Sequence, residues 1–223
     1  NHLEGHLYSS FISGDKINFP FICFLVTGGH TQIWEVRGIS DYLLHSNSID
    51  DAAGEAFDKG ARILGLGYPG GPEIEKKAIG GDPNFIKFTI PKIKNNPYDF
   101  SFSGLKTSIL YKTQEMDDKY IKKNINHIAA SYQEVIIDTL LDRLKKIIDL
   151  SNLNNISITG GVAANKRFRY KMQAMAEKDN LKCFFPDIKY CTDNAAMIAK
   201  VGYYKAKRGI ENSLSLEPRP NLH

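Results

Sequence analysis

The sequence predicts an α/β fold, and two observations carry that prediction. Short apolar runs of strand length end repeatedly at a glycine turn and lead into segments with helical spacing. The composition is that of a globular protein, with 42% apolar residues, 24% charged residues, 18 Gly and 9 Pro, and it excludes disordered, collagen-like and coiled-coil chains. The longest apolar run, Phe19 to Val26, is far shorter than the roughly 18 residues of a membrane span.

The first expected elements are a hairpin and two helices. The hairpin covers residues 21–36, with a glycine turn at residues 27–31 between its two strands. A helix is expected over residues 50–64, where apolar side chains recur at helical spacing and acidic residues at the start complement the helix dipole. Glycines and prolines end it, and Pro72 is expected as the first residue of a short helix that reaches Ala78.

The second half begins with an irregular segment. Residues 80–100 are rich in Gly, Pro, Asn and Lys, which is typical of a connection between lobes or of an insertion. Residues 121–148 carry apolar side chains at the spacing of a long helix. The remaining expected elements are a strand at 156–159, a helix from about Ala164, a strand at 183–185 and a last helix from Ala195 to Lys207.

Charge is divided unevenly along the chain. Residues 1–75 carry 4 Lys and Arg against 10 Asp and Glu, whereas residues 76–223 carry 25 against 15. The excess of lysine is either a solvated surface or a means of attracting a polyanion. The three cysteines have no C-x-x-C spacing, so neither a disulfide framework nor a cysteine zinc site is predicted, which fits a reducing, intracellular compartment.

Two histidines near the start have the spacing of metal ligands. His2 and His6 are four residues apart, so on a helix they share one face, and neutral imidazole is a common metal ligand. The pattern is not H-E-x-x-H, so the metalloprotease motif is absent. Two surface histidines are the alternative. A metal site needs a third ligand from a distant segment, because Glu4 points to another face of the helix.

Two glycine pairs, at residues 28–29 and 160–161, each follow a predicted strand. Glycine lets backbone N–H groups approach an anion closely, and the second pair also opens a helix. Neither pair matches the P-loop or the dinucleotide-binding pattern, and each by itself can be a tight turn.

Two polar clusters leave alternatives open. Asp51, Glu55 and Asp58 are expected on one helix face, either as a solvated stripe or with a carboxylate that accepts hydrogen bonds from ribose hydroxyls. Thr192 or Asp193 can serve as the N-cap of the last helix.

Seven motifs run in order across nearly the whole chain. They are HLEGH (2–6), VTGGHT (26–31), IDDAAGEAFDK (49–59), LGYPGGP (66–72), FSFSGLKT (100–107), GGVAAN (160–165) and CTDNAAMIA (191–199). By these motifs the chain resembles the TsaD/Kae1 family, and within it the bacterial and organellar TsaD type. These are tRNA N6-adenosine threonylcarbamoyltransferases of the actin/Hsp70/sugar-kinase (ASKHA) superfamily.

The resemblance implies a site with a metal part and a substrate part. His2, His6 and Asp193 would bind one divalent metal ion, iron or zinc. The implied substrate-binding residues are Leu25, Val26, Thr27, Gly28 and Gly29 on the phosphate side, Asp58, Gly71 and Glu75 at the ribose, and Asn165 in the second glycine loop. No catalytic nucleophile is implied, because AMP is a good leaving group and positioning with charge stabilisation suffices.

The implied reaction is the transfer of a threonylcarbamoyl group from threonylcarbamoyl-AMP to the exocyclic amine of the adenosine 3′ of the anticodon. The acceptors would be tRNAs that read codons beginning with A, and the product is t6A. The implied partners are tRNA and, in bacteria, TsaB-like and TsaE-like proteins, in the cytoplasm or an organelle and away from membranes. The alternatives are an inactive fragment or paralogue that binds nucleotide or partners, and a metalloprotease, which the missing H-E-x-x-H motif disfavours.

The resemblance also implies two lobes, with the first half of the N-terminal lobe missing. Residues 1–105 would be the rest of that lobe and residues 106–223 the C-terminal lobe, with an approximate boundary. Because the family begins upstream with a strand and a phosphate turn, the isolated chain is expected to bind metal weakly and to have little transferase activity. Thr27 stands where serine is also usual, and the ending lacks the family's common tryptophan.

Overall fold

The computed structural model describes residues 1–14, 17–91, 93–94 and 96–210, and its centre is one five-stranded mixed sheet. The strand order is β3-β2-β1-β4-β5. The strands are β1 (Phe21–Val26), β2 (Thr31–Gly38), β3 (Asp41–Asn47), β4 (Asn155–Thr159) and β5 (Lys182–Phe184). β1 to β3 form an antiparallel meander, and β4 joins β1 in parallel with β5 beyond it.

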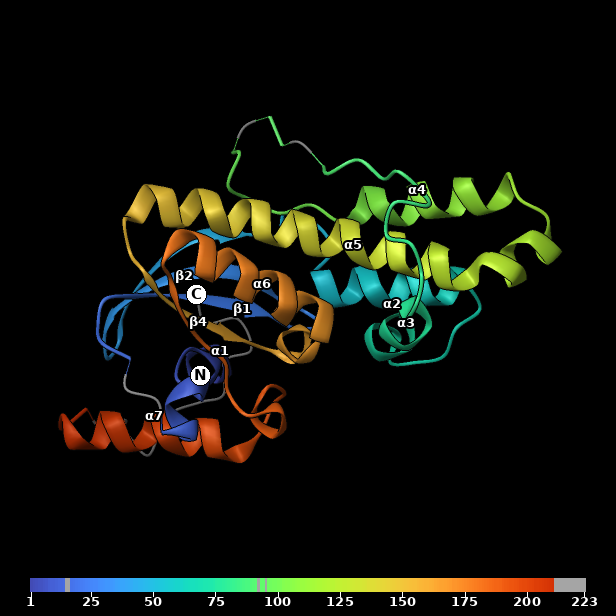
Figure 1. Ribbon diagram of the computed structural model, residues 1–223. Helices are drawn as coiled ribbons and strands as arrows, with labels where there is room; N and C mark the ends of the chain where they lie inside the picture. Colours follow the sequence, from blue (N-terminus) through green and yellow to red (C-terminus); the bar gives the residue numbers. More distant parts are fainter. Residues whose placement is uncertain (15–16, 92, 95, 211–223) are drawn as a thin grey trace.

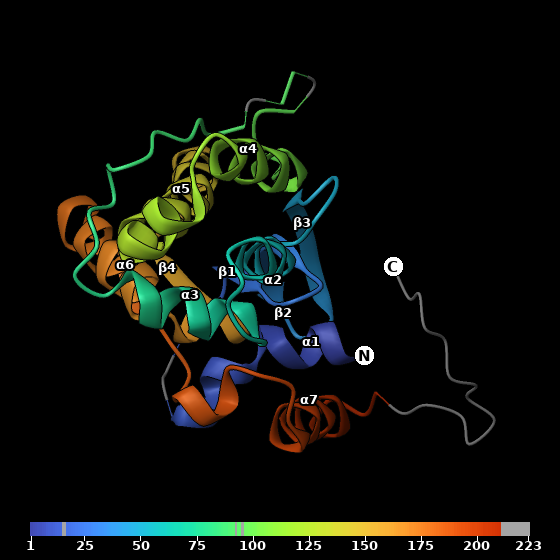
Figure 2. The same cartoon turned by 90° about the vertical axis from the view of Figure 1, so that its right-hand side faces the viewer.

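Helices cover both faces of the sheet. Figure 1 shows α4 and α5 above the sheet and α1 and α7 below it, and Figure 2 shows the same separation from the side. The helices are α1 (His2–Leu7), α2 (Ala53–Ile63), α3 (Gly70–Ala78), α4 (Ser103–Gln114), α5 (Asp118–Ser151), α6 (Lys166–Asp179) and α7 (Ala195–Lys207). Within the ranges that the structure describes, no helix is both long and apolar enough to cross a bilayer.

The core has two parts because β1 is buried on both faces. All six of its residues are fully buried, as expected for a strand that reads as one continuous apolar run. Ile22, Phe24 and Val26 belong to a large apolar cluster that includes residues of α2 to α6. Phe21 and Cys23 point the other way, into a smaller cluster with residues of α1 and α7. The result is a three-layer arrangement of helix, sheet and helix.

Most of the elements expected from the sequence are present. The hairpin over residues 21–36 is confirmed by the antiparallel pairing of β1 with β2. The expected helix over residues 50–64 is α2, and the expected last helix matches α7 from Ala195 to Lys207. The expected long helix over residues 121–148 is α5. The described residues between 80 and 100 contain no helix or named strand, in agreement with the expected irregular segment.

Three features differ from expectation. Pro72 is not the first residue of its helix: α3 begins at Gly70, because the Asp58 carboxylate accepts a hydrogen bond from the Gly70 N–H group at 2.7 Å and fixes the first turn. β3 and α4 have no counterpart among the expected elements. β3 is an edge strand with Leu43 and Leu44 about two-fifths exposed, so it lacks a clear apolar alternation.

The expected lobe boundary between residues 105 and 106 lies inside α4. β1 from one side of that boundary pairs with β4 from the other, with Phe24 opposite Ile158. Helices α2 and α5 also contribute to the same large apolar cluster. The described residues on both sides of the boundary therefore share one sheet and one core, because the parallel β1–β4 pairing needs segments from both.

Asp50 anchors the start of α4. Its Oδ1 atom accepts hydrogen bonds from the N–H groups of Phe102 (2.8 Å) and Ser103 (3.2 Å). Its Oδ2 atom accepts from the hydroxyl groups of Ser101 (2.6 Å) and Ser103 (2.8 Å). Burial acts to raise the pKa of Asp50, but these hydrogen bonds outweigh it and hold the pKa below its usual value.

Replacing Asp50 with alanine is expected to lower the free energy of unfolding by about 1 kcal/mol at neutral pH, the usual effect of losing a cap at a helix start. Because the folded pKa of Asp50 is depressed, its stabilisation is present above the unfolded pKa of about 4 and is lost as the pH falls through the folded value. Urea unfolding of the wild-type and Asp50→Ala proteins at neutral and acid pH measures the difference between their free energies of unfolding. A difference that stays constant down to about pH 2 would contradict the assignment.

Candidate functional site

Two imidazoles and a carboxylate meet where α1 lies beside the start of α7. The possible ligand atoms of His2, His6 and Asp193 all lie within 4.8 Å of one another. The Nε2 atom of His6 is 2.8 Å from Asp193 Oδ1. His2 and His6 lie on one face of α1, as their spacing predicts. The fold thus brings together the three residues expected to bind metal.

Buried polar contacts hold α1 in this position. The hydroxyl groups of Ser9 and Thr159 lie 2.6 Å apart and join the segment after α1 to the end of β4. Glu4 faces away from the histidines, as expected, and accepts hydrogen bonds from the Tyr42 hydroxyl (2.7 Å) and the Lys205 ammonium group (2.6 Å). α1 is therefore fixed to β4, β3 and α7 at once, which sets the direction of its histidines.

Asp193 is not the cap of α7. The side chain of Asn194 caps the helix, because its Oδ1 atom accepts a hydrogen bond from the Met197 N–H group at 2.9 Å. The alternative in which Thr192 or Asp193 serves as the N-cap is therefore wrong. The Asp193 side chain, 78% exposed, is instead directed to His6.

The protonation state of His6 suits a metal ligand. Burial lowers its pKa below the usual value, while the hydrogen bond and charge of Asp193 oppose that shift only in part. The ring is therefore neutral near pH 7. Its Nδ1 atom is buried and has no hydrogen-bond partner among the residues the structure describes. Two imidazoles and one carboxylate are donors that iron and zinc accept, so these residues fit a divalent metal.

A cavity of about 520 Å³ adjoins these residues, and we name it the histidine cavity. It is lined by His2, His6, Thr27, Gly28, Gly29, His30, Gly161, Thr192 and Asp193. The Thr27 hydroxyl accepts hydrogen bonds from the N–H groups of His30 (2.8 Å) and Gly29 (3.2 Å), which closes the turn after β1. Leu25 and Val26 lie within β1 with fully buried side chains, and neither lines this cavity.

Two glycines let this turn lie close to its neighbours. A Cβ atom at Gly54 would lie 2.7 Å from the Cα atom of Gly28, and the Gly54 N–H group donates to the Thr27 carbonyl at 3.2 Å. Gly160 has a φ of +96°, and a Cβ atom there would lie 2.3 Å from the Val26 carbonyl oxygen. Both contacts are shorter than any side chain tolerates, so glycine is required for this packing.

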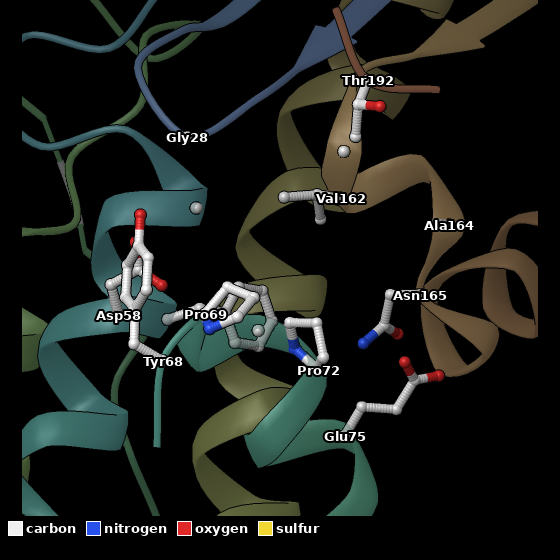
Figure 3. Close-up of a pocket in the computed structure, with 14 residues that line it drawn as sticks. Gly28, Asp58, Tyr68, Pro69, Pro72, Glu75, Val162, Ala164, Asn165 and Thr192 are labelled. Carbon is white, nitrogen blue, oxygen red and sulfur yellow. The ribbon is translucent and has the colours of Figure 1, made fainter. Parts of the chain in front are cut away.

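A second cavity of about 400 Å³, which we name the central cavity, lies between α2, α3 and the second glycine loop. Figure 3 shows Asp58 and Tyr68 on one side and Asn165 with Glu75 on the other. Its lining includes Gly28, Asp58, Gly71, Glu75 and Asn165, all of them expected substrate-binding residues. Gly28, Gly161 and Thr192 line both cavities, so the two are neighbours.

The carboxylates of the central cavity are only partly engaged. Asp58 Oδ1 accepts from the Gly70 N–H group, and Glu75 Oε1 accepts from the Lys166 N–H group at 2.6 Å. The second oxygen of each has no hydrogen-bond partner within the described part of the chain. Each acid therefore keeps an acceptor that a ligand hydroxyl could use.

The other two acids of the expected stripe have a structural role. Asp51 precedes α2 instead of lying within it. Lys59 forms ion pairs with both acids: its ammonium group lies 2.6 Å from Asp51 Oδ1 and 2.9 Å from Glu55 Oε1. Neither acid lines the histidine cavity or the central cavity.

The polar atoms of the Asn165 side chain form hydrogen bonds within the protein. Its Oδ1 atom caps α6 by accepting from the Phe168 N–H group at 2.9 Å, and its amide nitrogen donates to Gln133 Oε1 at 2.9 Å. Gln133 and Tyr68 are site residues without a counterpart in the sequence predictions. Tyr68, 83% exposed, lines the central cavity. A glutamine on the buried face of a long helix was the available signal for Gln133.

Comparison with known proteins gives a consistent result. The model of the family described as TsaD, tRNA N6-adenosine threonylcarbamoyltransferase, matches residues 1–200. The protein of that name from Thermosipho africanus (strain TCF52B) is 46% identical over 222 residues, covering 100% of this chain and 67% of its own length. The protein of the same name from Fervidobacterium nodosum is 46% identical over 225 residues, covering 100% of this chain and 66% of its own length. The chain spans about two thirds of the length of these curated relatives.

A solved structure shows the same fold at low sequence identity. Full-length HypF, in its phosphate- and nucleotide-bound form, matches with a TM-score of 0.71 at 12% identity, covering 95% of this chain and 43% of HypF. That likeness concerns the fold alone, and it agrees with the actin/Hsp70/sugar-kinase (ASKHA) fold that the family resemblance implied. The family itself follows from the sequence matches. The chain belongs to the TsaD family of tRNA N6-adenosine threonylcarbamoyltransferases.

Proposed function

We propose that this chain holds the donor substrate and the metal of a tRNA N6-adenosine threonylcarbamoyltransferase. The reaction would move the threonylcarbamoyl group of threonylcarbamoyl-AMP to the exocyclic amine of the adenosine 3′ of the anticodon. The observation that carries the proposal is the contact between the two cavities: the histidine and carboxylate donors line one, and the free carboxylate oxygens line the other. An adenylate needs such neighbouring sites for its phosphate and its ribose.

In this proposal the metal site consists of His2, His6 and Asp193, with one iron or zinc ion. When bound, the ion supplies positive charge and Lewis acidity at the phosphate or the carbamoyl group. The turn formed by Thr27, Gly28 and Gly29 lines the same cavity, and its glycines let an anion come close to the backbone. Leu25 and Val26 would act indirectly, as the buried strand from which this turn projects.

The ribose would lie in the central cavity. Asp58 and Glu75 each offer a free carboxylate oxygen to its hydroxyl groups, and Gly71 leaves the wall between them without a side chain. Asn165 would shape the cavity through its bonds to Gln133 and α6. Attack by the amine forms the new N–C bond while the bond from the carbonyl carbon to the phosphate oxygen breaks. AMP departs with the bonding electron pair, and the amine gives up one proton to water or to the departing phosphate. Alignment of amine and carbonyl supplies much of the acceleration.

The partners follow from this reaction. The acceptor is a tRNA that reads codons beginning with A, and in a bacterial cell TsaB-like and TsaE-like proteins would assist. A tRNA substrate and cysteines without metal or disulfide spacing both agree with the cytoplasm or an organelle as the site of action. Full-length protein incubated with threonylcarbamoyl-AMP, tRNA and these partners should produce modified adenosine. If AMP binds and no modified adenosine forms, the alternative of an inactive nucleotide-binding paralogue is correct.

Replacing Glu75 with glutamine is expected to weaken AMP binding about tenfold, because a hydrogen bond from ribose to a charged acceptor is lost. Isothermal titration calorimetry with AMP measures the effect. Glu73→Gln is the matched control: it lies on the same helix and lines neither cavity, so its affinity should stay within about twofold. Equal affinities for Glu75→Gln and wild type would show that the ribose lies elsewhere.

A further inference from the structure

A third cavity, of about 480 Å³, adjoins the central cavity, and we name it the lysine cavity. It shares Pro72 and Glu75 with the central cavity. Its other polar lining residues are Lys76, Gln133, Lys166 and Arg167. The side chains of Lys76, Lys166 and Arg167 have no role at the metal or the ribose in the proposed function, and Gln133 contributes there only through its Oε1 atom, which binds Asn165. The lysine cavity therefore has polar groups whose purpose is unexplained.

Hydrogen bonds fix the direction of the Gln133 amide. The Asn165 Oδ1 atom accepts from the Phe168 N–H group, so its amide nitrogen must face Gln133, where it donates to Oε1 at 2.9 Å. The NH₂ group of Gln133 is then directed away from Asn165, and it donates to no acceptor among the described residues. Gln133 is only 6% exposed and lines the lysine cavity. The side chain as a whole is buried, but its NH₂ group is open to the solvent of the cavity, where a ligand oxygen can accept a hydrogen bond from it.

The charges around the lysine cavity favour an anion. Lys76 and Lys166 are exposed and form no ion pair with any residue the structure describes. Lys166 is also the first residue of α6, where a cation is placed unfavourably at the positive end of the helix dipole. Arg167 is already paired with Glu134 at 2.8 Å. Glu75 is the one acid in the lining, and its Oε1 atom accepts from Lys166 N–H.

We infer that the lysine cavity binds a phosphodiester group of the RNA acceptor, through Lys76, Lys166 and the Gln133 amide. The inference rests on the proposed function, in which an RNA base must approach the donor in the adjoining central cavity. A backbone phosphate next to that base carries the negative charge that two unpaired lysines and an amide N–H donor facing the cavity would recognise. Phosphate contacts of this kind set the position of the RNA without reading its sequence.

The test measures RNA binding and AMP binding separately on the full-length protein. An anticodon stem-loop RNA is titrated by fluorescence anisotropy over a range of salt concentrations, and AMP is titrated by calorimetry. Lys166→Gln is expected to weaken RNA binding at least fivefold and to reduce the slope of log affinity against log salt by about 0.7, the value for one phosphate contact on a single strand. Lys76→Gln should act in the same way. AMP affinity should stay within about twofold of wild type in both.

Two further variants make the test specific. Gln133→Glu keeps the acceptor for Asn165 and replaces the unpaired NH₂ group with a carboxylate oxygen, so it should also weaken RNA binding at least fivefold. Lys77→Gln, the neighbour of Lys76 on α3 that does not line the cavity, should leave the affinity nearly unchanged. Each variant should unfold on heating at the same temperature as the wild-type protein, which would show that it is folded.

The outcomes separate this inference from the proposed function. An unchanged salt slope in Lys76→Gln and Lys166→Gln would overturn the inference, and so would a matching loss of AMP affinity, because the cavity would then belong to the donor. Absence of RNA binding in the wild-type protein would overturn both proposals. RNA binding that depends on these lysines, without formation of modified adenosine, would support the inference while the proposed transfer failed.

Discussion

Replacing Asp193 with alanine is expected to weaken metal binding by the full-length protein more than about 100-fold. Loss of a hydrogen-bonding partner behind a ligand already costs about 10- to 100-fold, and Asp193 is in direct reach of the site. It is the only carboxylate of the three clustered residues, and its exposed side chain can be removed without leaving a hole in the core. Its loss would leave two imidazoles without the carboxylate, which neither balance the charge of a divalent ion nor complete a three-ligand site.

Metal content measured by mass spectrometry after dialysis, and iron and zinc titrations against a competing chelator, provide the readout. Asp187→Ala is the matched control, because Asp187 is also an exposed acid in the segment before α7 and belongs to no described cluster of metal ligands. Stoichiometric metal in the Asp193→Ala protein would show that the ion is held by other residues.

Replacing Gly160 with alanine is expected to lower the free energy of unfolding by about 2 to 6 kcal/mol. The φ of +96° is one that residues with a side chain rarely adopt, and the strain costs about 1 to 3 kcal/mol. In addition, the new Cβ atom would lie 2.3 Å from the carbonyl oxygen of Val26, at the end of β1. Relief would require β4 to move away from β1, its partner in the middle of the sheet, so overpacking adds a further cost of about 1 to 3 kcal/mol.

Gly161 provides a matched control one residue further along. A Cβ atom there would make an ordinary contact, 3.8 Å from the Cγ2 atom of Thr192, and its φ lies outside the left-handed region. Gly161→Ala should therefore change the free energy of unfolding by less than about 1 kcal/mol. Urea unfolding followed by circular dichroism compares the two. Equal stabilities for Gly160→Ala and Gly161→Ala would show that the close approach of the two loops is not required.

Local pattern predicts the hairpin and α7 well, because each depends mainly on neighbouring residues. β1 is a run of six apolar residues that ends at glycine, and α7 follows a residue suited to capping. The pairing of β1 with β4 depends on segments far apart in the chain, so local pattern could not predict it. β3 escaped prediction for a related reason: an edge strand with exposed leucines has no alternation to detect.

In the candidate site, too, local features could be predicted from the sequence and contacts between distant segments could not. Helical spacing places His2 and His6 on one face, but 187 residues separate His6 from Asp193, and their contact depends on α1 lying beside α7. Only the family resemblance linked them. At the start of α7, Thr192, Asp193 and Asn194 are all good capping residues by type, and the backbone conformation selects Asn194. A polar residue on the buried face of a long helix marks Gln133 for attention, but pattern gives it no role, because that role depends on the orientation of the Asn165 amide.

The distance along the chain between the histidines and Asp193 has a consequence for biosynthesis. A ribosome makes α1 among the first described residues, yet the third member of the cluster emerges only after β4 has been made. Until then the nascent chain displays two histidines without the carboxylate. The complete trio forms late, when α7 docks against α1, so any metal loading that needs all three residues has to follow translation of that segment.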